Sequence, residues 1–385
     1  MQKKRICFVV AVPGTAQSFL KDHFTKLSLD YDIYLVGNIS DDSQISNLKI
    51  CSYKSIQIER GINIFTDIKA LFNLVRFFKE MKFFSVHSVT PKAGLLTAIA
   101  AYMARVPNRI HIFTGQVWAT KTGMFRKLLM MMDWLISHLN TLTLVDGESQ
   151  RQYLIKHKIV KEDKSFVIGH GSISGVNIER FKPSKEVRNN IRISLGIKED
   201  QIVFIFLGRL NKDKGINELF HAFNKLALEN QSVYLLLVGI DEEGLVPKAS
   251  NYPHIKPERN FHFYGKTPTP EILLQAGDVF CLPTYREGFG TSVIEASCLG
   301  LPVICSDTYG VLDAMIDNVT GLRCVTKDTE SLYHQMKKLA ENPTLRTELG
   351  NNGRKRVIEH FSGEVISNSW LQFYNDLTLK YTHLS

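Results

Sequence analysis

Short runs of apolar residues alternate with longer segments of helical periodicity along the whole chain. In the first half the runs read ICFVVAV (6–12), DIYLVG (32–37), FFSVHS (83–88), RIHIF (109–113), TLTLV (141–145) and SFVIG (165–169). In the second half they read IVFIFLG (202–208), VYLLLVG (233–239), FHFYG (261–265), VFCLP (279–283) and PVICS (302–306). Unbroken apolar runs of this length predict strands buried on both faces, as in parallel sheets. Strands that take turns with helices predict an α/β fold built from βαβ units.

The length of the chain predicts two domains. A chain of 385 residues exceeds what one hydrophobic core usually supports. In GSISGVNIERFKPSKE (171–186), Gly, Ser, Pro and charged residues replace the apolar pattern. We therefore predict doubly wound domains at 1–175 and 176–361, with a ligand cleft at the carboxyl ends of their strands. Trp370, Phe373 and Leu377 have helical spacing, and we expect a helix over 362–385 to pack back on the first domain.

Cysteine usage and hydropathy exclude several classes of protein. The six cysteines include no C-x-x-C pair, which favours reduced thiols in a cytoplasmic protein and argues against a zinc site. The basic N-terminus precedes an apolar run of only seven residues (6–12) without a cleavage site, so a first strand is favoured over a signal peptide. The apolar helical stretch at 93–104 is too short to span a bilayer.

The excess positive charge lies in the first half of the chain. Residues 1–178 carry 23 Lys and Arg against 13 Asp and Glu, whereas residues 179–385 carry 24 against 25. This indicates either a solvated basic face or attraction to an anionic surface. Two amphipathic helical segments, 68–84 and 123–139, favour membrane contact. In the first of them Ile68, Leu71, Phe72, Val75 and Phe78 form the stripe predicted to pack on the sheet.

Three strands of the second half are followed by residues suited to a diphosphate. GRLNKDKG (208–215) places Arg209 and Lys214 just beyond one strand, and Gly239 follows the next. REGFGTSVIE (286–295) follows the strand VFCLP. Glycines let backbone N–H groups approach phosphate oxygens, and the two cations would neutralise them. A lone loop lysine is more often only solvated, but two cations at the carboxyl end of one strand favour a site.

Glu295 has two interpretations. Ser292 and Glu295 match a capping box, in which the glutamate returns to the backbone of the helix start. That interpretation leaves Arg286, Glu287 and both neighbouring glycines unexplained. A carboxylate in this first turn could instead accept hydrogen bonds from two ribose hydroxyls. The local residues leave both interpretations open.

The two motifs together resemble family 4 of the retaining GT-B glycosyltransferases. Glu287 and Glu295 have the spacing E-x7-E, and GRLNKDKG lies upstream. Further similar segments are TPKAGLL (90–96), RIHIFTGQVWATKTG (109–123), DGESQ (146–150), GSISGVNIERF (171–181), ASCLGLPVICSD (296–307) and TGLRC (320–324). They resemble the branch that builds bacterial capsules and O-antigens, and the similarity covers nearly the whole chain. It implies two Rossmann-like domains facing a central cleft.

The resemblance also implies roles for individual residues. Arg209 and Lys214 would bind the donor diphosphate and stabilise the leaving group, and Glu287 would contact hydroxyls of the donor sugar. The implied donor-binding positions are Gly14, Thr114, Gly115, Gln116, Gly208, Gly239, Gly288, Phe289, Gly290, Thr291 and Glu295. No cofactor or metal is expected. Asp30 and Asp32 form a D-x-D string, but it stands at the start of a strand and hence at the wrong end for the cleft.

One position departs from the family pattern. Gly115 matches a His-Gly pair that many members carry after this strand, but Thr114 stands in place of the histidine. Threonine cannot act as a base, so we interpret Thr114 with Gln116 as an altered donor contact. His111 and His170 are the nearby alternatives, and the catalytic base stays open.

The predicted activity is transfer of a hexose or N-acetylhexosamine, with retention, from a UDP-sugar to a saccharide on undecaprenyl diphosphate. The enzyme would work in the cytoplasm, peripheral to the inner face of the plasma membrane, with Arg76, Lys79 and Lys92 near lipid phosphates. Nucleic acid is not an expected partner, because the cations do not interleave with aromatics on a sheet face. A GT-B-fold sugar-nucleotide epimerase and a non-catalytic scaffold, the latter motivated by Thr114, are the alternatives. The sugar, the linkage and the oligomeric state cannot be deduced from the sequence.

Overall fold

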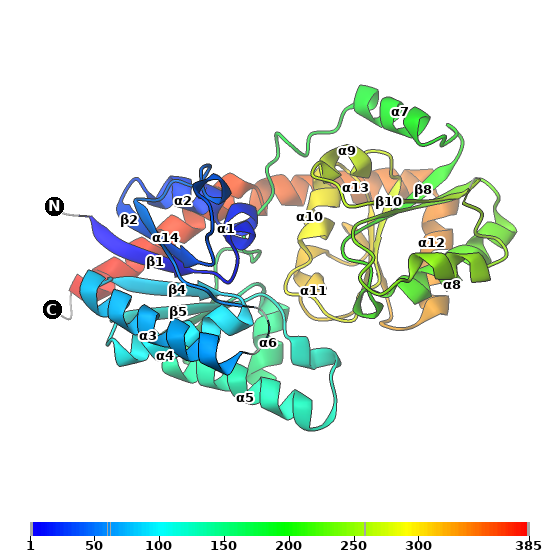
Figure 1. The fold of residues 1–385 in the computed structure, drawn as a ribbon. Coiled ribbons are helices and arrows are strands. Elements are labelled where there is room, and N and C mark those ends of the chain that lie inside the picture. The colour runs from blue at the N-terminus through cyan, green and yellow to red at the C-terminus, as the bar shows by residue number, and fades with distance from the viewer. Residues whose placement is uncertain (1–2, 60, 62, 258, 383–385) are drawn as a thin grey trace. The chain divides into compact units, whose positions relative to one another are not determined.

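The computed structural model describes residues 3–59, 61, 63–257 and 259–382, and it divides into two compact units. Unit 1 consists of Met1–Gly175 and Gly363–Ser385, and unit 2 is Val176–Ser362. Each unit contains one parallel sheet with helices on both faces (Figure 1). Unit 1 is therefore discontinuous in sequence, whereas unit 2 is a single stretch of chain.

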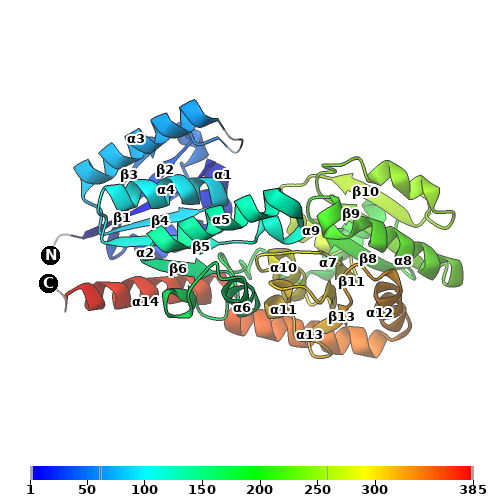
Figure 2. The ribbon, with the colours of Figure 1, turned by 90° about the horizontal axis from the view of Figure 1, so that it is seen from below.

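In the described part of unit 1, seven parallel strands form a sheet in the order β3-β2-β1-β4-β5-β6-β7. The strands are β1 Lys4–Val9, β2 Tyr31–Gly37, β3 Ser52–Ser55, β4 Ser85–Val89, β5 Asn108–Phe113, β6 Leu142–Val145 and β7 Ser165–Val167. The helices are α1 Pro13–Phe19, α2 Lys21–Leu27, α3 Ile64–Met81, α4 Pro91–Met103, α5 Gly123–Leu139, α6 Glu148–Lys156 and α14 Gly363–Thr382. Figure 2 shows α3, α4 and α5 side by side on one face of this sheet.

The apolar runs form the strands as predicted, because their side chains are buried on both faces. Ile6, Cys7, Phe8 and Val9 of β1 are inaccessible to solvent. The exposed edge strand β3 was not predicted, because its four residues, SYKS, are largely polar and carry no buried side chain.

Helix α14 closes the face of the sheet opposite α3, α4 and α5. Trp370 and Tyr374 are fully buried, and the ring of Trp370 stacks on His23 at 4.9 Å. His23 Nε2 lies 2.6 Å from the carbonyl oxygen of Ile173, and Nδ1 lies 2.9 Å from Ser367 Oγ. The carbonyl oxygen can only accept, so Nε2 carries the proton and Nδ1 accepts from the serine. This neutral ring agrees with burial, which lowers the pKa of His23 to about 4.

The stripe predicted on α3 is only partly in the core. Ala70, Leu74 and Phe78 pack against the sheet, whereas Ile68 is 48% and Phe72 69% exposed. The prediction that Ile68 and Phe72 pack on the sheet is therefore wrong. The helix has apolar residues on two faces, and the predicted stripe combined residues of the buried face with residues of the exposed one.

In the described part of unit 2, six parallel strands lie in the order β10-β9-β8-β11-β12-β13. The strands are β8 Ile202–Leu207, β9 Val233–Val238, β10 Phe261–Gly265, β11 Val279–Leu282, β12 Val303–Ser306 and β13 Gly321–Cys324. The helices are α7 Lys185–Ser194, α8 Ile216–Glu229, α9 Pro270–Leu274, α10 Thr291–Cys298, α11 Val311–Ala314, α12 Thr329–Glu341 and α13 Pro343–His360. The central strands β8 and β11 are neighbours, so the loops that follow them meet at the carboxyl edge of the sheet.

Candidate functional site

The loops after β8 and β9 are joined by backbone contact that requires glycine. Gly239 follows β9 with φ +144°, and a Cβ there would lie 1.7 Å from the carbonyl oxygen of Gly208. The ladder then continues beyond the strands, because Leu210 N donates to the Ile240 carbonyl at 2.8 Å and Glu242 N donates to the Leu210 carbonyl at 3.0 Å. Gly208 and Gly239 thereby fix the loop that presents Arg209.

Arg209 faces a carboxylate from the second of these loops. Its Nη1 lies 3.0 and 3.4 Å from the two carboxylate oxygens of Glu242. Asn211 Nδ2 donates to the same carboxylate at 2.8 Å. The Asn211 hydrogen bond and the nearby Arg209 and Lys214 cations lower the pKa of Glu242. Glu242 was not predicted as a site residue, although the three acids of GIDEEG (239–244) follow β9 directly.

The loop between β11 and α10 is tied to the loop after β8. Lys214 forms an ion pair with Glu287, and both side chains are largely buried. Arg286 Nε lies 2.8 Å from Asp213 Oδ2, and Thr284 Oγ1 donates to the Asp213 carbonyl at 3.0 Å. The structure thus brings the predicted residues Lys214 and Glu287 into contact. We call Arg209–Glu242, Lys214–Glu287 and Arg286–Asp213 the three site ion pairs.

Helix α10 begins at this site without a side-chain cap. Its N-cap is Gly290, at φ +88°, followed by Thr291 as the first helical residue. Ser292 lies inside the helix and makes no cap, so the capping-box interpretation of Ser292 and Glu295 is wrong. Gly290 takes the left-handed conformation that a serine would adopt only with strain. Phe289 is buried and its ring lies 5.2 Å from that of Phe361, which anchors the loop, and the neighbouring Gly288 is buried as well.

Glu295 lies one turn into α10 and is mostly buried. Burial raises its pKa to about 7, against the opposing effect of Arg180, and Glu271 raises it further. Among the described residues, no protein group forms a hydrogen bond with this carboxyl. A buried carboxyl without a protein partner is suited to hydroxyls of a ligand.

The predicted donor contacts of unit 1 follow β1 and β5. Gly14 lies in the first turn of α1, and nothing lies within 4 Å of the position a Cβ would take, so internal packing does not require this glycine. Thr114 and Gly115 (φ +123°) follow β5 and are partly exposed. Gln116 is fully buried, and its side-chain carbonyl accepts from Gln150 Nε2 at 3.1 Å.

A buried pair behind this loop was missed by the sequence analysis. Trp118 Nε1 donates to Asp133 Oδ2 at 2.7 Å, and the Trp118 ring stacks on Tyr153 at 5.3 Å. Burial raises the pKa of Asp133 to about 7. A single aspartate among MMMDWL was the available signal, since a charge on the buried face of a helix needs a partner.

The two histidines considered near Thr114 differ in environment. His111 is buried in β5, with Nδ1 2.9 Å from Ser88 Oγ, and burial lowers its pKa to about 3. It lies against Gly94, where a Cβ would come within 2.4 Å of the imidazole. His170 is exposed after β7. His111 is therefore a packing residue of the core.

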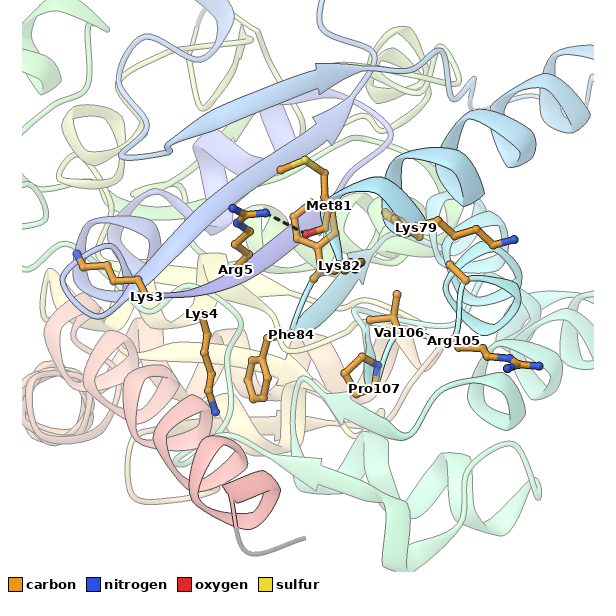
Figure 3. A pocket seen from close by; sticks show the side chains of 13 residues that line it. Lys3, Lys4, Arg5, Lys79, Met81, Lys82, Phe84, Arg105, Val106 and Pro107 are labelled. Carbon is orange, nitrogen blue, oxygen red and sulfur yellow. Dashed lines mark hydrogen bonds between the residues drawn. The ribbon is translucent and has the colours of Figure 1, made fainter. Parts of the chain in front are cut away.

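The structure does not bring the three predicted lipid-phosphate residues together. Lys92, at the start of α4, forms an ion pair with Asp67 at 2.8 Å. Arg76 forms an exposed pair with Glu80 within α3. Lys79 lies at the other end of α3, on the wall of a basic cavity of about 650 Å³ (Figure 3). Its lining includes Lys3, Lys4 and Arg5 at the start of β1 and Lys82 and Arg105 just beyond the ends of α3 and α4.

Comparison with known proteins places the chain in a family. The family "Glycosyl transferases group 1" matches residues 187–356. The capsular polysaccharide biosynthesis glycosyltransferase CapM of Staphylococcus aureus is 31% identical over 345 residues, covering 89% of this chain and 90% of CapM. The chain belongs to the group 1 glycosyltransferases. The family resemblance expected from the two motifs is thus confirmed.

Two further relatives have more specific names. This glycosyltransferase is 24% identical over 348 residues to N,N'-diacetylbacillosaminyl-diphospho-undecaprenol alpha-1,3-N-acetylgalactosaminyltransferase of Campylobacter jejuni, covering 88% and 89% of the chains. It is 26% identical over 309 residues to UDP-Gal:alpha-D-GlcNAc-diphosphoundecaprenol alpha-1,3-galactosyltransferase of Escherichia coli, covering 79% and 78%.

Solved structures confirm the predicted fold class. HepE of Anabaena, solved in complex with UDP, superposes with a TM-score of 0.80 at 18% identity, covering 97% of this glycosyltransferase and 100% of HepE. Sucrose-phosphate synthase of Thermosynechococcus elongatus gives a TM-score of 0.77 at 20% identity, covering 98% and 100%. At these identities the likeness shows the GT-B fold of two Rossmann-like domains.

Among the described residues, no cluster of three or more His, Cys, Asp or Glu side chains is suited to a metal ion. Within the same residues, every helix is too short or too polar to cross a bilayer.

Proposed function

We propose that this protein is a retaining hexosyl- or N-acetylhexosaminyltransferase acting in capsule, O-antigen or exopolysaccharide synthesis. It moves a sugar from a nucleotide-sugar, of the UDP-sugar class, to a saccharide linked to undecaprenyl diphosphate. The contact of Lys214 with Glu287 carries this proposal, because it sets a cation for the diphosphate beside a carboxylate for the sugar hydroxyls. The names of the two undecaprenol-specific relatives support the acceptor class.

The side chains of unit 2 would assist departure of the nucleotide. Arg209 and Lys214 are placed to take up negative charge on the β-phosphate as its bond to the sugar C1 breaks. The acceptor hydroxyl oxygen bonds to C1 on the same face, which retains the configuration, and its proton passes to the departing phosphate oxygen. Glu295 accepts hydrogen bonds from the ribose hydroxyls. No metal ion enters this proposal, since the two cations supply the charge.

A donor screen tests the transfer. Purified protein is incubated with UDP- and GDP-sugars and a short-chain lipid diphosphate saccharide, and the products are analysed by mass and NMR. We expect one donor to add one sugar in an α linkage. Conversion of a UDP-sugar to its epimer without any gain in acceptor mass would support the epimerase instead. Nucleotide binding without turnover on any donor or acceptor would support a scaffold.

We further propose that unit 1 docks on the inner face of the plasma membrane. On α3, Ile64, Phe65, Ile68 and Phe72 are exposed, with Phe65 at 89%. On α5 the exposed apolar residues are Met124, Phe125, Leu128, Met131 and Trp134. Both helices lie on one face of the sheet (Figure 2). Exposed apolar side chains on a positively charged domain favour an anionic lipid surface.

Vesicle sedimentation tests this docking. Phe65→Ser with Phe72→Ser should reduce binding to phosphatidylglycerol vesicles by at least about tenfold, because two exposed aromatic side chains that would enter the lipid are removed. Ile193→Ser, which removes a 77% exposed apolar side chain from α7 of unit 2, is the matched control and should bind like the wild type. Equal binding of all three proteins would contradict the docking.

A further inference from the structure

The donor site is electrically balanced before any donor arrives. The three site ion pairs join three cations to three carboxylates, so their six side chains carry no net charge. A nucleoside diphosphate therefore competes with these carboxylates for the cations as it enters. When the product leaves, the carboxylates can return to the same cations. Binding and release of the nucleotide thus involve an exchange of one anion for another.

Two of the three carboxylates have another function in the site. Glu287 is released from Lys214 to contact sugar hydroxyls in the proposed reaction. The Asp213 carboxylate holds Arg286 and so ties the two loops together, and the backbone carbonyl of Asp213 adds hydrogen bonds from Thr284 and Tyr285. The proposed reaction gives Glu242 no contact with the donor. We therefore consider what its contact with Arg209 does.

Glu242 offers Arg209 what a phosphate would offer. Both carboxylate oxygens lie within 3.4 Å of Arg209 Nη1, and Asn211 donates to the same group. The carboxylate stands on a fixed loop, because Asp241 accepts from the backbone N–H groups of Leu245 and Val246, both at 2.9 Å. A fixed carboxylate competes at all times for the one guanidinium that the β-phosphate also needs.

We propose that Glu242 is a release residue, whose carboxylate draws Arg209 away from the diphosphate and keeps the affinity for the product UDP low. This inference rests on the proposed function of the site. It assigns Arg209 two alternating partners, Glu242 before and after turnover and the β-phosphate during it. In many enzymes product release limits turnover, so a weaker product complex raises the turnover rate.

The variant Glu242→Gln tests the proposal by a gain of affinity. Glutamine keeps the size and the polar contacts but removes the negative charge, so UDP should bind on the order of fivefold more tightly, as expected for a partly exposed charge pair. Damage to the fold would weaken binding, so the direction of the change separates the two effects. In steady-state assays kcat should fall together with the inhibition constant of UDP.

Glu243→Gln is the matched control. Glu243 carries the same charge one residue along the loop, but it contacts the backbone N–H of Lys212 rather than Arg209. UDP affinity of this variant should stay near that of the wild type. In an Arg209→Ala background, Glu242→Gln should no longer tighten binding, because the contested cation is gone.

Titration calorimetry with UDP gives outcomes that are distinct for the two proposals. If the wild type binds UDP and Glu242→Gln binds it equally or more weakly, the release role is wrong and the proposed transferase stands. An equal gain in Glu242→Gln and Glu243→Gln would reduce the effect to general charge and also overturn the role. If the wild type does not bind UDP, the proposed donor site fails, and the inference fails with it.

Discussion

The two units share one architecture but use the carboxyl edges of their sheets differently. In unit 2 the loops at that edge hold the three site ion pairs. In unit 1 the corresponding loop after β5 is held by uncharged hydrogen-bond donors. Gln150 donates to the side chain of Gln116, and Trp118 donates to Asp133, whose pKa is raised by burial to about 7. Unit 2 is thus suited to an anionic ligand, and unit 1 to neutral hydroxyl groups.

The difference shows what each kind of recognition requires. A diphosphate needs cations, and cations held near a dry surface need counter-charges while the ligand is absent. Hydroxyl groups need only well-placed neutral donors and acceptors, which a buried amide network supplies without net charge. Substitutions and changes of pH should therefore affect the two units differently.

Removing Glu287 should have the largest effect. In Glu287→Ala the sugar loses its carboxylate contact and Lys214 loses its partner, so kcat/KM should fall by about 100-fold or more, as for the loss of one transition-state contact. The melting temperature should fall by a few degrees, because Lys214 is left largely buried without its partner, but the protein should still fold. Turnover near the wild-type rate would show that the donor sugar does not lie against this carboxylate.

Lys214→Ala should mainly weaken nucleotide binding. Loss of one charge-assisted hydrogen bond to a phosphate should raise the dissociation constant of UDP about 30-fold. Lys212→Ala removes an exposed cation from the same loop, one without an ion pair among the described residues, and should bind UDP almost normally. Equal losses in the two variants would mean that only the overall charge of the loop matters.

Unit 1 should respond to acid through its buried histidines. The pKa of His23 is lowered from 6.5 to about 4, so between these values the unfolded chain binds more protons than the folded one. Stability is therefore complete above pH 6.5 and is lost as the pH falls towards 4. At pH 5 His23 alone should cost about 2 kcal/mol. Burial also lowers the pKa of His87 and His111, which adds in the same direction.

Tryptophan fluorescence measures this loss in unit 1 alone, since Trp118, Trp134 and Trp370 all belong to it. Urea unfolding at pH 7.5 and pH 5 should show a smaller difference in His23→Gln than in the wild type. His138→Gln, at an exposed position of α5, serves as the control and should keep the full difference. The same difference in unfolding free energy between pH 7.5 and pH 5 in all three proteins would show that His23 does not remain neutral.

Glu295 should give unit 2 a smaller pH dependence, in nucleotide affinity. Because its pKa is about 7, the carboxyl is partly protonated near neutral pH and must lose this proton to accept hydrogen bonds from two ribose hydroxyls. UDP should therefore bind about tenfold more weakly at pH 6 than at pH 8. Glu295→Gln should keep only the pH dependence of the diphosphate itself, so the difference between the two proteins isolates this group. Parallel curves would remove Glu295 from the ribose.

The charged loops of unit 2 could be read from the sequence more easily than the neutral loops of unit 1. Cations and glycines after an apolar run mark a loop whose place in a parallel sheet is known, so Arg209, Lys214 and Glu287 could be chosen together. The partner of Arg209 could not be predicted from the sequence, because GIDEEG offers three acids and only the geometry of the loop selects Glu242. Trp118 and Asp133 pair through the packing of a helix against a turn, which no local pattern reveals.

Fold prediction failed where burial and local pattern disagree. The polar strand β3 pairs only through its backbone with β2, so its side chains give no signal. Ile68 and Phe72 have the spacing of a packed stripe but face solvent, and periodicity cannot tell which of two apolar faces meets the sheet. This ambiguity is informative, because only one apolar face of α3 packs on the sheet and the other is free to contact another surface.

The discontinuity of unit 1 sets an order on synthesis of the protein. Residues 176–362 form unit 2 as one continuous stretch, so the contacts that define this unit do not include α14. Unit 1 begins first but must wait for α14, because the surface that Trp370 and Tyr374 cover remains open until that helix has been made. A chain that stops just after unit 2 would therefore contain all of unit 2 and would expose the apolar surface of unit 1 that α14 covers.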